Sequence, residues 1–342
     1  MTSWFASPRV AGAGRTPQSH RRSWAALVAR WTAGAAHAAI VAWWTAGAAH
    51  AAIALLLAGA CAHRAAAPGA KLWIGGDVFL GTGGHGALAA MPAIVGGTPG
   101  VVNLEGPVGD VDGRPELRLL HAPGALAELR AAGVAVAGIA NNHARDAGPG
   151  GPAATVRALA AVGVQAAGGP AGPAIVTLGG LRVVVTAHDL AAGVPATLRA
   201  ELAAARRRGD VLVATFHVTG PPTYLPRPEL LDAVAIALEA GAAVIAAHGT
   251  HELARVERRG RAVIAWGLGN LAFACACTDE PSAAVLEVAL GPDGAGEAAI
   301  IPIDAGLAGS AARAAEDPAL TYELLEALGA TRLQRLGSRA RF

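Results

Sequence analysis

Side chains that can bind a metal ion or move a proton recur at one kind of position in this sequence, directly after a short apolar run. Five such runs are followed by Asp77, by Asn103 and Glu105, by Asn141, Asn142 and His143, by His217, and by His248 and His251. Carboxylate, amide and imidazole groups together favour Mn, Fe or Zn over calcium or a structural zinc site. The pattern therefore predicts a metal centre, provided that the five runs end at the same place.

The elements that must position these residues are β-strands, because the apolar runs are short and alternate with longer amphipathic segments. We expect strands over 71–75, 101–104, 134–140, 174–178, 181–187, 210–216, 243–247, 262–266, 284–290 and 298–303, and helices over 123–132, 150–162, 195–207 and 228–240. This alternation is typical of an α/β domain, in which ligands bind at the carboxyl ends of the strands. Gly179-Gly180 between two strands predicts a hairpin, so we expect a mixed sheet.

Each candidate residue also has a structural explanation when it is considered alone. An aspartate after a strand is commonly a turn residue, and Asn141-Asn142 can cap the helix expected from residue 150. His217 alone fits a hydrogen-bonded core histidine. His248 and His251 carry more weight, because two histidines three residues apart in a loop can bind one ion. The shared position of all five groups is what favours the metal centre.

The first 60 residues have the composition of a targeting segment. They contain five arginines and no acidic residue, and residues 31–60 carry no charged side chain apart from two histidines. A basic stretch followed by an apolar run is typical of an export signal or a membrane anchor. Small residues before Cys61 predict a lipoprotein whose lipid is attached to Cys61, and a single uncleaved membrane-spanning helix is the alternative. Both place the remainder of the chain outside the cytoplasmic membrane, in the cell envelope.

The rest of the chain divides into three parts by composition. Residues 61–70 are an Ala/Pro/Gly linker, residues 71–305 hold the expected strands and helices, and residues 306–342 are polar, helix-prone and basic at their end. Without residues 1–60 the formal net charge changes from +2 to −3, because 22 of the 27 basic residues and all 25 acidic residues remain. Neither charge indicates nucleic acid as a partner.

Several motifs of the sequence match those of a known protein family. They are Gly76-Asp77-Val78-Phe79-Leu80-Gly81, Asn103-Leu104-Glu105-Gly106, Ala140-Asn141-Asn142-His143-Ala144-Arg145-Asp146, His248-Gly249-Thr250-His251 and Gly267-Leu268-Gly269-Asn270. In these motifs the chain resembles the CapA-type capsule synthesis proteins, also called poly-γ-glutamate capsule proteins, over residues 71–303. That family is similar to the calcineurin-like metallophosphoesterases. The resemblance therefore implies an α/β sandwich of two mixed β-sheets flanked by helices, with a metal centre at one edge.

The resemblance also implies roles for individual residues. The ligands of one or two divalent ions would be Asp77, Glu105, Asn142, His217, His248 and His251. His143 would protonate the leaving group, and Asp146 would orient His143 or brace its loop. Asn103, Asn141 and Asn270 would support the site, with Asn270 holding the loop that faces it.

The sequence departs from the family and its superfamily in three places. The superfamily opens with Asp-x-His, whereas this chain has Asp77-Val78-Phe79, so the first metal position lacks one ligand. The segment after His217 has no glutamate where the family has Glu-Tyr, and Thr250 replaces a proline of the His-x-Pro-His loop. The last two departures concern substrate contacts more than metal binding.

Two functions are compatible with these observations. The first is an exported metal-dependent hydrolase that acts on a phosphoester, or on an amide or ester bond of an anionic envelope polymer such as poly-γ-glutamate or a capsule polysaccharide. The second is a non-catalytic envelope component that binds or guides such a polymer during its assembly or export. A simple phosphatase is a third alternative. In each case the expected partners are the substrate or polymer and the membrane, reached through the N-terminal anchor or lipid.

Overall fold

The computed structural model of the protein describes residues 70–83, 85–110 and 118–342. The expected targeting segment, the lipidation site at Cys61 and most of the linker lie outside these residues. The described residues belong to one compact unit of the chain. Within them, no helix combines the length and the hydropathy that crossing a bilayer requires.

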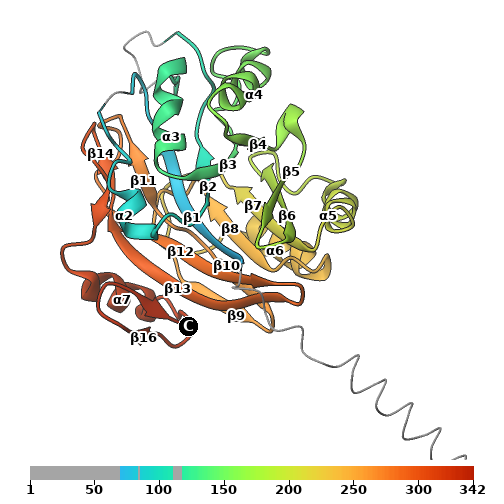
Figure 1. Cartoon of the computed structure of the whole chain (residues 1–342), viewed down its shortest axis with the longest axis vertical. Coiled ribbons are helices and arrows are strands. Elements are labelled where there is room, and N and C mark those ends of the chain that lie inside the picture. Colours follow the sequence, from blue (N-terminus) through green and yellow to red (C-terminus); the bar gives the residue numbers. More distant parts are fainter. Residues whose placement is uncertain (1–69, 84, 111–117) are drawn as a thin grey trace, which may run out of the picture. The chain divides into compact units, whose positions relative to one another are not determined.

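The larger of the two sheets in the described residues has eleven strands, and it carries one half of the site (Figure 1). Its main path runs β16 (Gln334–Arg335), β17 (Ala340–Arg341), β13 (Gly294–Asp304), β12 (Ser282–Gly291), β1 (Ala70–Phe79), β2 (Gly100–Leu104), β3 (Val134–Gly138) and β4 (Gln165–Ala167). Three further strands join it, namely β11 (Asn270–Phe273), β14 (Gly306–Leu307) and β15 (Arg313–Ala314). Strand β1 is parallel to β2 and β11 and antiparallel to β12, so the sheet is mixed.

The smaller sheet has six strands within the described residues, and it carries the other half of the site. Its order is β5 (Ala174–Leu178), β6 (Leu181–Asp189), β7 (Val211–His217), β8 (Val244–His248), β10 (Ala262–Ala265) and β9 (Val256–Arg259). Strands β6, β7, β8 and β10 are parallel, and antiparallel strands lie at both edges. Strands β5 and β6 form the hairpin predicted from Gly179-Gly180.

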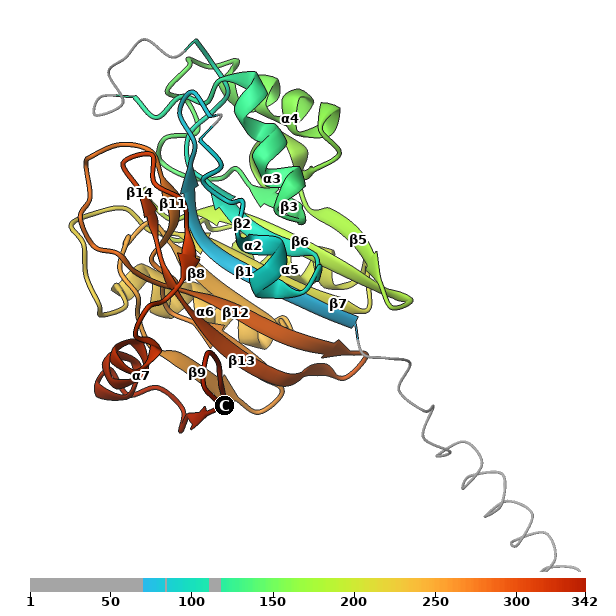
Figure 2. The same ribbon diagram turned by 60° about the vertical axis from the view of Figure 1, so that its left-hand side comes forward.

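Helices cover the outer faces of the two sheets (Figures 1 and 2). The larger sheet is covered by α2 (Met91–Val95), the 3-10 turn η1 (Pro123–Leu126), α3 (Ala127–Ala131) and α4 (Gly151–Ala161), and the smaller sheet by α5 (Leu198–Arg206) and α6 (Pro228–Glu239). A short 3-10 turn, η2 (Gly169–Ala171), follows β4, and α7 (Pro318–Ala327) lies near the C-terminus.

The core has three apolar layers, because successive side chains of a strand point to opposite faces. On β1, Leu72 and Ile74 pack between the two sheets, where they meet residues such as Val185 and Val213, whereas Trp73 packs against the outer helices. A third cluster joins the smaller sheet to α5 and α6. The predicted fold class, an α/β sandwich of two mixed sheets flanked by helices, is confirmed.

All ten predicted strands and four predicted helices are present, with differences at their ends, and the helix expected over 123–132 begins as the 3-10 turn η1. Helix α2 and strands β4, β9 and β11 are additional to the predicted elements. Strand β1 continues to Phe79 instead of ending at residue 75. The two glycines at this point, Gly75 and Gly76, suggest a turn in the sequence, but their role is close packing. A Cβ on Gly76 would lie 1.9 Å from the carbonyl oxygen of Gly269 next to β11. The extension of β1 is what brings Asp77 into the site.

Residues 306–342, which are helix-prone in the sequence, contain a helix and also extend the larger sheet. They contain β14, β15, β16 and β17, and β17 pairs directly with β13. Tyr322 and Leu325 of α7 are buried in the cluster that includes the inner faces of both sheets. These strands are two residues long, which is too short for an alternating pattern to appear in the sequence.

Candidate metal centre

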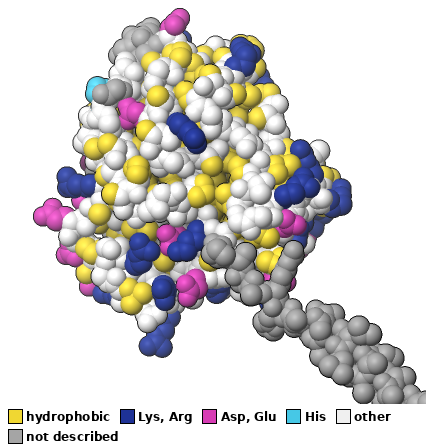
Figure 3. Space-filling model, in the orientation of Figure 1, with side chains coloured by type: hydrophobic (Ala, Val, Ile, Leu, Met, Phe, Trp, Pro, Cys, Tyr) yellow, Lys and Arg dark blue, Asp and Glu magenta, His cyan; other side chains and the backbone are white. Residues whose placement is uncertain are grey.

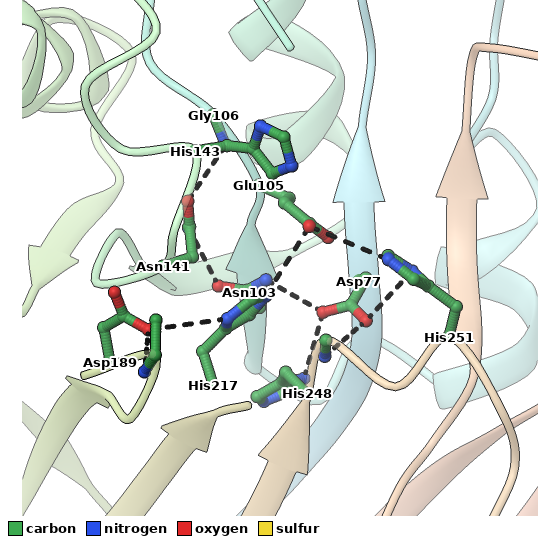
Figure 4. A network of polar contacts seen from close by, with 12 residues as sticks. Asp77, Asn103, Glu105, Gly106, Asn141, His143, Asp189, His217, His248 and His251 are labelled. Carbon is green, nitrogen blue, oxygen red and sulfur yellow. Dashed lines mark hydrogen bonds and ion pairs between the residues drawn. The ribbon is translucent and has the colours of Figure 1, made fainter. Parts of the chain in front are cut away.

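The larger sheet contributes carboxylate and amide groups from the ends of three neighbouring strands (Figure 4). Asp77 on β1 lies opposite Asn103 on β2 and opposite Asn270 on β11. Glu105 follows β2, and its backbone N–H donates to the carbonyl of Val78 at 2.9 Å. Each of these four polar side chains belongs to a residue that is at most 3% exposed. The predicted strand ends therefore do converge, and they do so in the interior.

The smaller sheet contributes imidazoles and a further carboxylate. His217 ends β7 and lies opposite Asp189 on β6 and opposite His248 on β8. His251 follows in the loop after β8, with a left-handed φ of 59°. Such a conformation is uncommon for residues other than glycine, and strained residues of this kind are concentrated at functional sites. His251 is directed at the carboxylates of the other sheet (Figure 4).

Five of the six predicted metal ligands meet in one cluster. Ligand atoms of Asp77, Glu105 and His217 all lie within 4.8 Å of one another. His248 Nδ1 lies 3.7 Å from Asp77 Oδ1, and His251 Nδ1 lies 3.6 Å from Asp77 Oδ2. His251 Nε2 lies 3.8 Å from Glu105 Oε1. Two carboxylates and three imidazoles thus surround a small space, which is a donor set that suits a divalent transition metal.

The cluster contains buried polar atoms without a hydrogen-bond partner. They are both ring nitrogens of His217, both ring nitrogens of His248, and Glu105 Oε2. Buried polar atoms are nearly always paired, because leaving one unpaired costs free energy. A metal ion would take one nitrogen of each ring and the free oxygen of Glu105, so the residues that are present fit a divalent ion.

The charges within the cluster hold a proton on His217. Burial opposes a charged ring, but the carboxylates of Asp189, Glu105 and Asp77 outweigh burial and raise the pKa of His217 to about 10. Burial also opposes the charge of Glu105, yet His217 and the neighbouring histidines leave the pKa of Glu105 below its ordinary value. His248 differs, because burial dominates there and lowers its pKa to about 4. Without metal, the imidazolium of His217 therefore supplies the positive charge that the carboxylates require.

A chain of amide groups fixes the position of Asp77. The side-chain amide of Asn103 donates to Asp77 Oδ1 at 2.8 Å, and that of Asn141 donates to Asn103 Oδ1 at 3.2 Å and to the carbonyl of Leu104 at 2.9 Å. Asn141 Oδ1 accepts from the backbone N–H of Gly106 at 3.3 Å. Asn142, the family-implied ligand, is exposed, whereas Asn141 is buried. The structure therefore brings Asn141, and not Asn142, into this network.

The predicted acid and its partner form a pair at the rim of the cluster. His143 Nδ1 lies 2.8 Å from Asp146 Oδ2, and the same oxygen accepts from the backbone N–H of Leu119 at 2.7 Å. The side chain of His143 is 31% exposed, and its ring lies beside Glu105 (Figure 4). A partly exposed imidazole with one nitrogen bound to a carboxylate can pass a proton through the other nitrogen.

Asn270 holds the loop that carries His251. Asn270 Oδ1 lies 2.9 Å from His251 Nδ1. The glycine of the same loop has a separate role: Gly249 donates its backbone N–H to Asp77 Oδ2 at 2.9 Å, with a φ of 86°. A Cβ at this position would lie 2.5 Å from His217 Nε2. The His-Gly-Thr-His motif thus needs its glycine, because a side chain here would collide with His217 and Val218 at the end of β7.

Two residues of the site were not singled out from the sequence. Asp189 lies 3.8 Å from His217 Nδ1, and it ends an apolar strand, so the rule that selected the other residues applies to it as well. His121 is fully buried and links two strand ends, because Nδ1 accepts from the N–H of Leu80 at 3.3 Å and Nε2 donates to the carbonyl of Glu105 at 3.0 Å. No sequence pattern marks His121, which lies outside the predicted strands and helices.

A comparison with protein families matches residues 87–274 to the family described as bacterial capsule synthesis protein PGA_cap. The matched segment is more than half of the 342-residue chain. It contains Glu105, His143, His217, His248 and His251, whereas Asp77 lies ahead of it. A comparison with curated proteins gives no match. The resemblance seen in the motifs is confirmed, and the chain belongs to the PGA_cap family of bacterial capsule synthesis proteins.

Proposed function

We propose that this protein is a metal-dependent hydrolase that acts in capsule synthesis at the bacterial cell envelope. The observation that carries the proposal is the set of buried donor atoms without partners on His217, His248 and Glu105. One or two divalent ions would take one nitrogen of each ring and the free oxygen of Glu105, with Mn, Fe or Zn as the candidates. Membership of a capsule synthesis family supports the biological setting.

The chemistry would be divided between the ion and the side chains around it. When bound, the ion would supply Lewis-acid activation of water and of the scissile bond. His143 would give its Nε2 proton to the leaving group, since its Nδ1 is held by Asp146. Asp146 is in turn fixed by the N–H of Leu119. Asp77 would be kept in place by Asn103 and Gly249, one on each oxygen.

The substrate we propose is a phosphoester, or an amide or ester bond of an anionic envelope polymer such as poly-γ-glutamate or a capsule polysaccharide. Nucleic acid is not part of the proposal. On the face seen in Figure 3, basic and acidic side chains are interspersed, whereas proteins that follow a nucleic-acid backbone present a continuous basic track.

We also propose that the protein is exported and attached to the membrane by a lipid on Cys61, with an uncleaved N-terminal anchor as the alternative. The support is the arginine-containing and then apolar composition of residues 1–60. A Cys61→Ala variant of the full-length protein distinguishes the two. Loss of metabolic lipid labelling together with retention of the uncleaved length supports the lipoprotein, whereas an unlabelled wild-type protein that stays at the membrane supports the anchor.

The first test is the metal content of purified full-length protein after growth with added manganese and zinc. One or two equivalents in the wild type, and a sharp decrease in His248→Ala, are expected. A His85→Ala variant is the control, because His85 is exposed and contacts only Thr82 among its described hydrogen-bond partners. A well-folded wild-type protein without bound metal would contradict the proposal.

The second test is turnover. The metal-loaded protein is offered simple phosphomonoesters, phosphodiesters, poly-γ-glutamate and isolated capsule polysaccharide. His143→Ala is expected to retain its metal and to lose turnover by about 100-fold or more. Cleavage of simple phosphoesters alone would favour a phosphatase, and cleavage of a polymer alone would favour a polymer-specific enzyme.

One observation favours a second candidate, a polymer-binding component without catalysis. Phe79 stands where the superfamily has a metal-binding histidine, and it is buried against His121 and Phe273. The first metal position therefore has fewer donors than a full two-metal site. Metal binding without turnover of any offered substrate, combined with loss of capsule in the His248→Ala strain, would support this candidate.

A further inference from the structure

We propose that Asp189 is the positioning residue of the metal centre, which holds the His217 ring so that Nε2 faces Glu105 and the ion. This inference rests on the proposed metal binding. It adds a third strand of the smaller sheet, β6, to the machinery of the site. Neither the sequence motifs nor the cluster of ligand atoms includes Asp189.

The contacts place Asp189 and Glu105 on opposite sides of one imidazole ring. Glu105 Oε1 lies 3.5 Å from His217 Nε2, and Asp189 Oδ1 lies 3.8 Å from His217 Nδ1 (Figure 4). A carboxylate next to Nδ1 favours the neutral tautomer that carries its proton there. The lone pair is then on Nε2, which points to the cluster of metal ligands. A carboxylate that orients a metal-binding histidine in this way is a general device of metal sites.

The backbone around Asp189 is fixed, so its side chain can act as a support. Asp189 and His217 are register partners at the ends of β6 and β7, and the N–H of Leu190 donates to the carbonyl of His217 at 2.8 Å. Asp189 Oδ1 also accepts from the N–H of Ala191 at 3.0 Å. The carboxylate is therefore held at the strand end, in contact with the ring that it orients.

Among the described residues, the His217 ring makes no hydrogen bond and has two ion-pair partners, Glu105 on the Nε2 side and Asp189 on the Nδ1 side. On the Nε2 side the ring is confined by Gly249, where even a Cβ would come within 2.5 Å. This confinement limits tilting of the ring, but it does not choose between the two tautomers. An ion bound at Nε2 would leave the proton on Nδ1, where Asp189 is the carboxylate that faces it.

The test uses full-length protein and three variants. Asp189→Ala removes the carboxylate, Asp189→Asn keeps an oxygen that can accept from Nδ1–H, and Asp210→Asn is the control. Asp210 is a matched aspartate, because it also accepts a backbone N–H, that of Arg182 on β6 at 2.8 Å, but it directly precedes β7, at the end of that strand away from His217. The side chain of Asp189 is 31% exposed, so its truncation leaves no closed cavity.

The first readout is affinity for Zn²⁺, measured by competition with a chromophoric chelator. We expect Asp189→Ala to bind about 10- to 100-fold more weakly than the wild type, and Asp189→Asn to recover part of the loss. Asp210→Asn is expected to bind like the wild type. Equal affinities of Asp189→Ala and the wild type would overturn the proposal.

The second readout is the protonation of His217, followed by NMR on ¹⁵N-histidine-labelled protein with and without Zn²⁺. In the zinc-loaded wild type we expect the proton on Nδ1, protected from exchange with water, and in Asp189→Ala we expect this protection to be lost. If the wild type binds no metal, the proposed function fails, but the metal-free spectra still test Asp189. Identical Nδ1–H signals in the wild type and Asp189→Ala would then overturn the inference.

Discussion

The buried polar network has two halves that differ in how completely they are bonded. In the amide half, Asp77 accepts from Asn103 and from Gly249, and Asn141 joins the chain to the backbone. In the imidazole half, His217 and His248 leave all four ring nitrogens without hydrogen bonds. Both halves are equally inaccessible to solvent. The amide half is thus a scaffold whose polar groups are already paired, whereas the ring nitrogens of the imidazole half gain partners only when a ligand binds.

This difference separates residues that shape the site from residues that bind at it. The hydrogen bonds of the amide half fix the position of the Asp77 carboxylate, and they contribute to the free energy of folding. The imidazoles are placed by strand register and by the Gly249 loop. The free-energy cost of burying their unpaired nitrogens is offset only when a ligand binds. Changes in the two halves should therefore affect stability and metal affinity in different proportions.

The largest expected effect is the loss of stability of the metal-free protein in acid. Burial lowers the pKa of both His121 and His248 from 6.5 to about 4. The folded protein keeps both rings neutral, whereas the unfolded chain binds a proton at each ring near pH 6.5. Stability is therefore complete above pH 6.5 and is lost as the pH falls toward 4, by up to about 3 kcal/mol for each ring.

Urea unfolding between pH 7 and pH 4 measures this loss. His121→Gln removes one titrating ring and should remove about half of the loss. Added metal should change only the part of the stability loss that His248 causes, because both ring nitrogens of His121 are bonded to the backbone. A stability that does not change between pH 7 and pH 4 would contradict the assignment to these two rings.

Next in size is the effect of His217→Ala. At pH 7 this substitution removes the positive charge that neutralises the buried carboxylate of Glu105. The free energy of unfolding of the metal-free protein should decrease by about 3–5 kcal/mol, and metal binding should be lost. Urea unfolding and metal analysis measure the two effects. Glu105→Gln in the His217→Ala background should restore part of the stability, and no restoration would refute this explanation.

A smaller effect is expected for Asn103→Ala in the amide half. Asp77 Oδ1 would lose its donor, and the amide of Asn141 would lose one acceptor. We expect a decrease of about 1–3 kcal/mol in the free energy of unfolding, with a weaker metal affinity as a secondary effect. If Asn103→Ala abolished metal binding at unchanged stability, the distinction between scaffold and ligands would fail.

The smallest effect should come from the neighbouring pair Asn141 and Asn142. Asn141→Ala breaks three hydrogen bonds of a buried side chain and should cost about 2 kcal/mol of stability. Asn142→Ala changes an exposed side chain and should alter stability by less than about 0.5 kcal/mol. Metal titration of both variants adds a second comparison. A large loss of metal affinity in Asn142→Ala alone would establish the family-implied ligand and revise the geometry of its loop.

Much of the fold and of the donor set could be predicted because both depend on the same local signal. Each apolar run is long enough to define a strand, and the residue that ends the run is fixed at the edge of the sheet. Asp77, His217 and His248 were identified in this way, and the register of their strands places them side by side. Asp189 has the same signal, because it also ends an apolar strand.

The rest depends on contacts that local sequence does not encode. His121 accepts a hydrogen bond from the backbone N–H of Leu80, 41 residues away, although it lies outside the described helices and strands. The choice between Asn141 and Asn142 depends on which of two adjacent side chains faces inward. A loop has no regular alternation of buried and exposed positions from which this could be predicted. The continuation of β1 through Gly76 depends on the approach of Gly269, which directly precedes β11 and lies nearly 200 residues later in the chain.

The donor atoms come from both sheets, and this origin has a mechanical consequence. Asp77 already accepts a hydrogen bond from Gly249 across a separation of 172 residues. An ion that binds Asp77 together with His217 or His248 would tie the two sheets together much as a covalent cross-link does, closing a long loop of chain. Separation of the sheets would then have to wait for release of the ion. Metal loading should therefore slow global unfolding far more than it slows fraying of the outer helices, so that the lifetime of the folded chain becomes a measure of its metal occupancy.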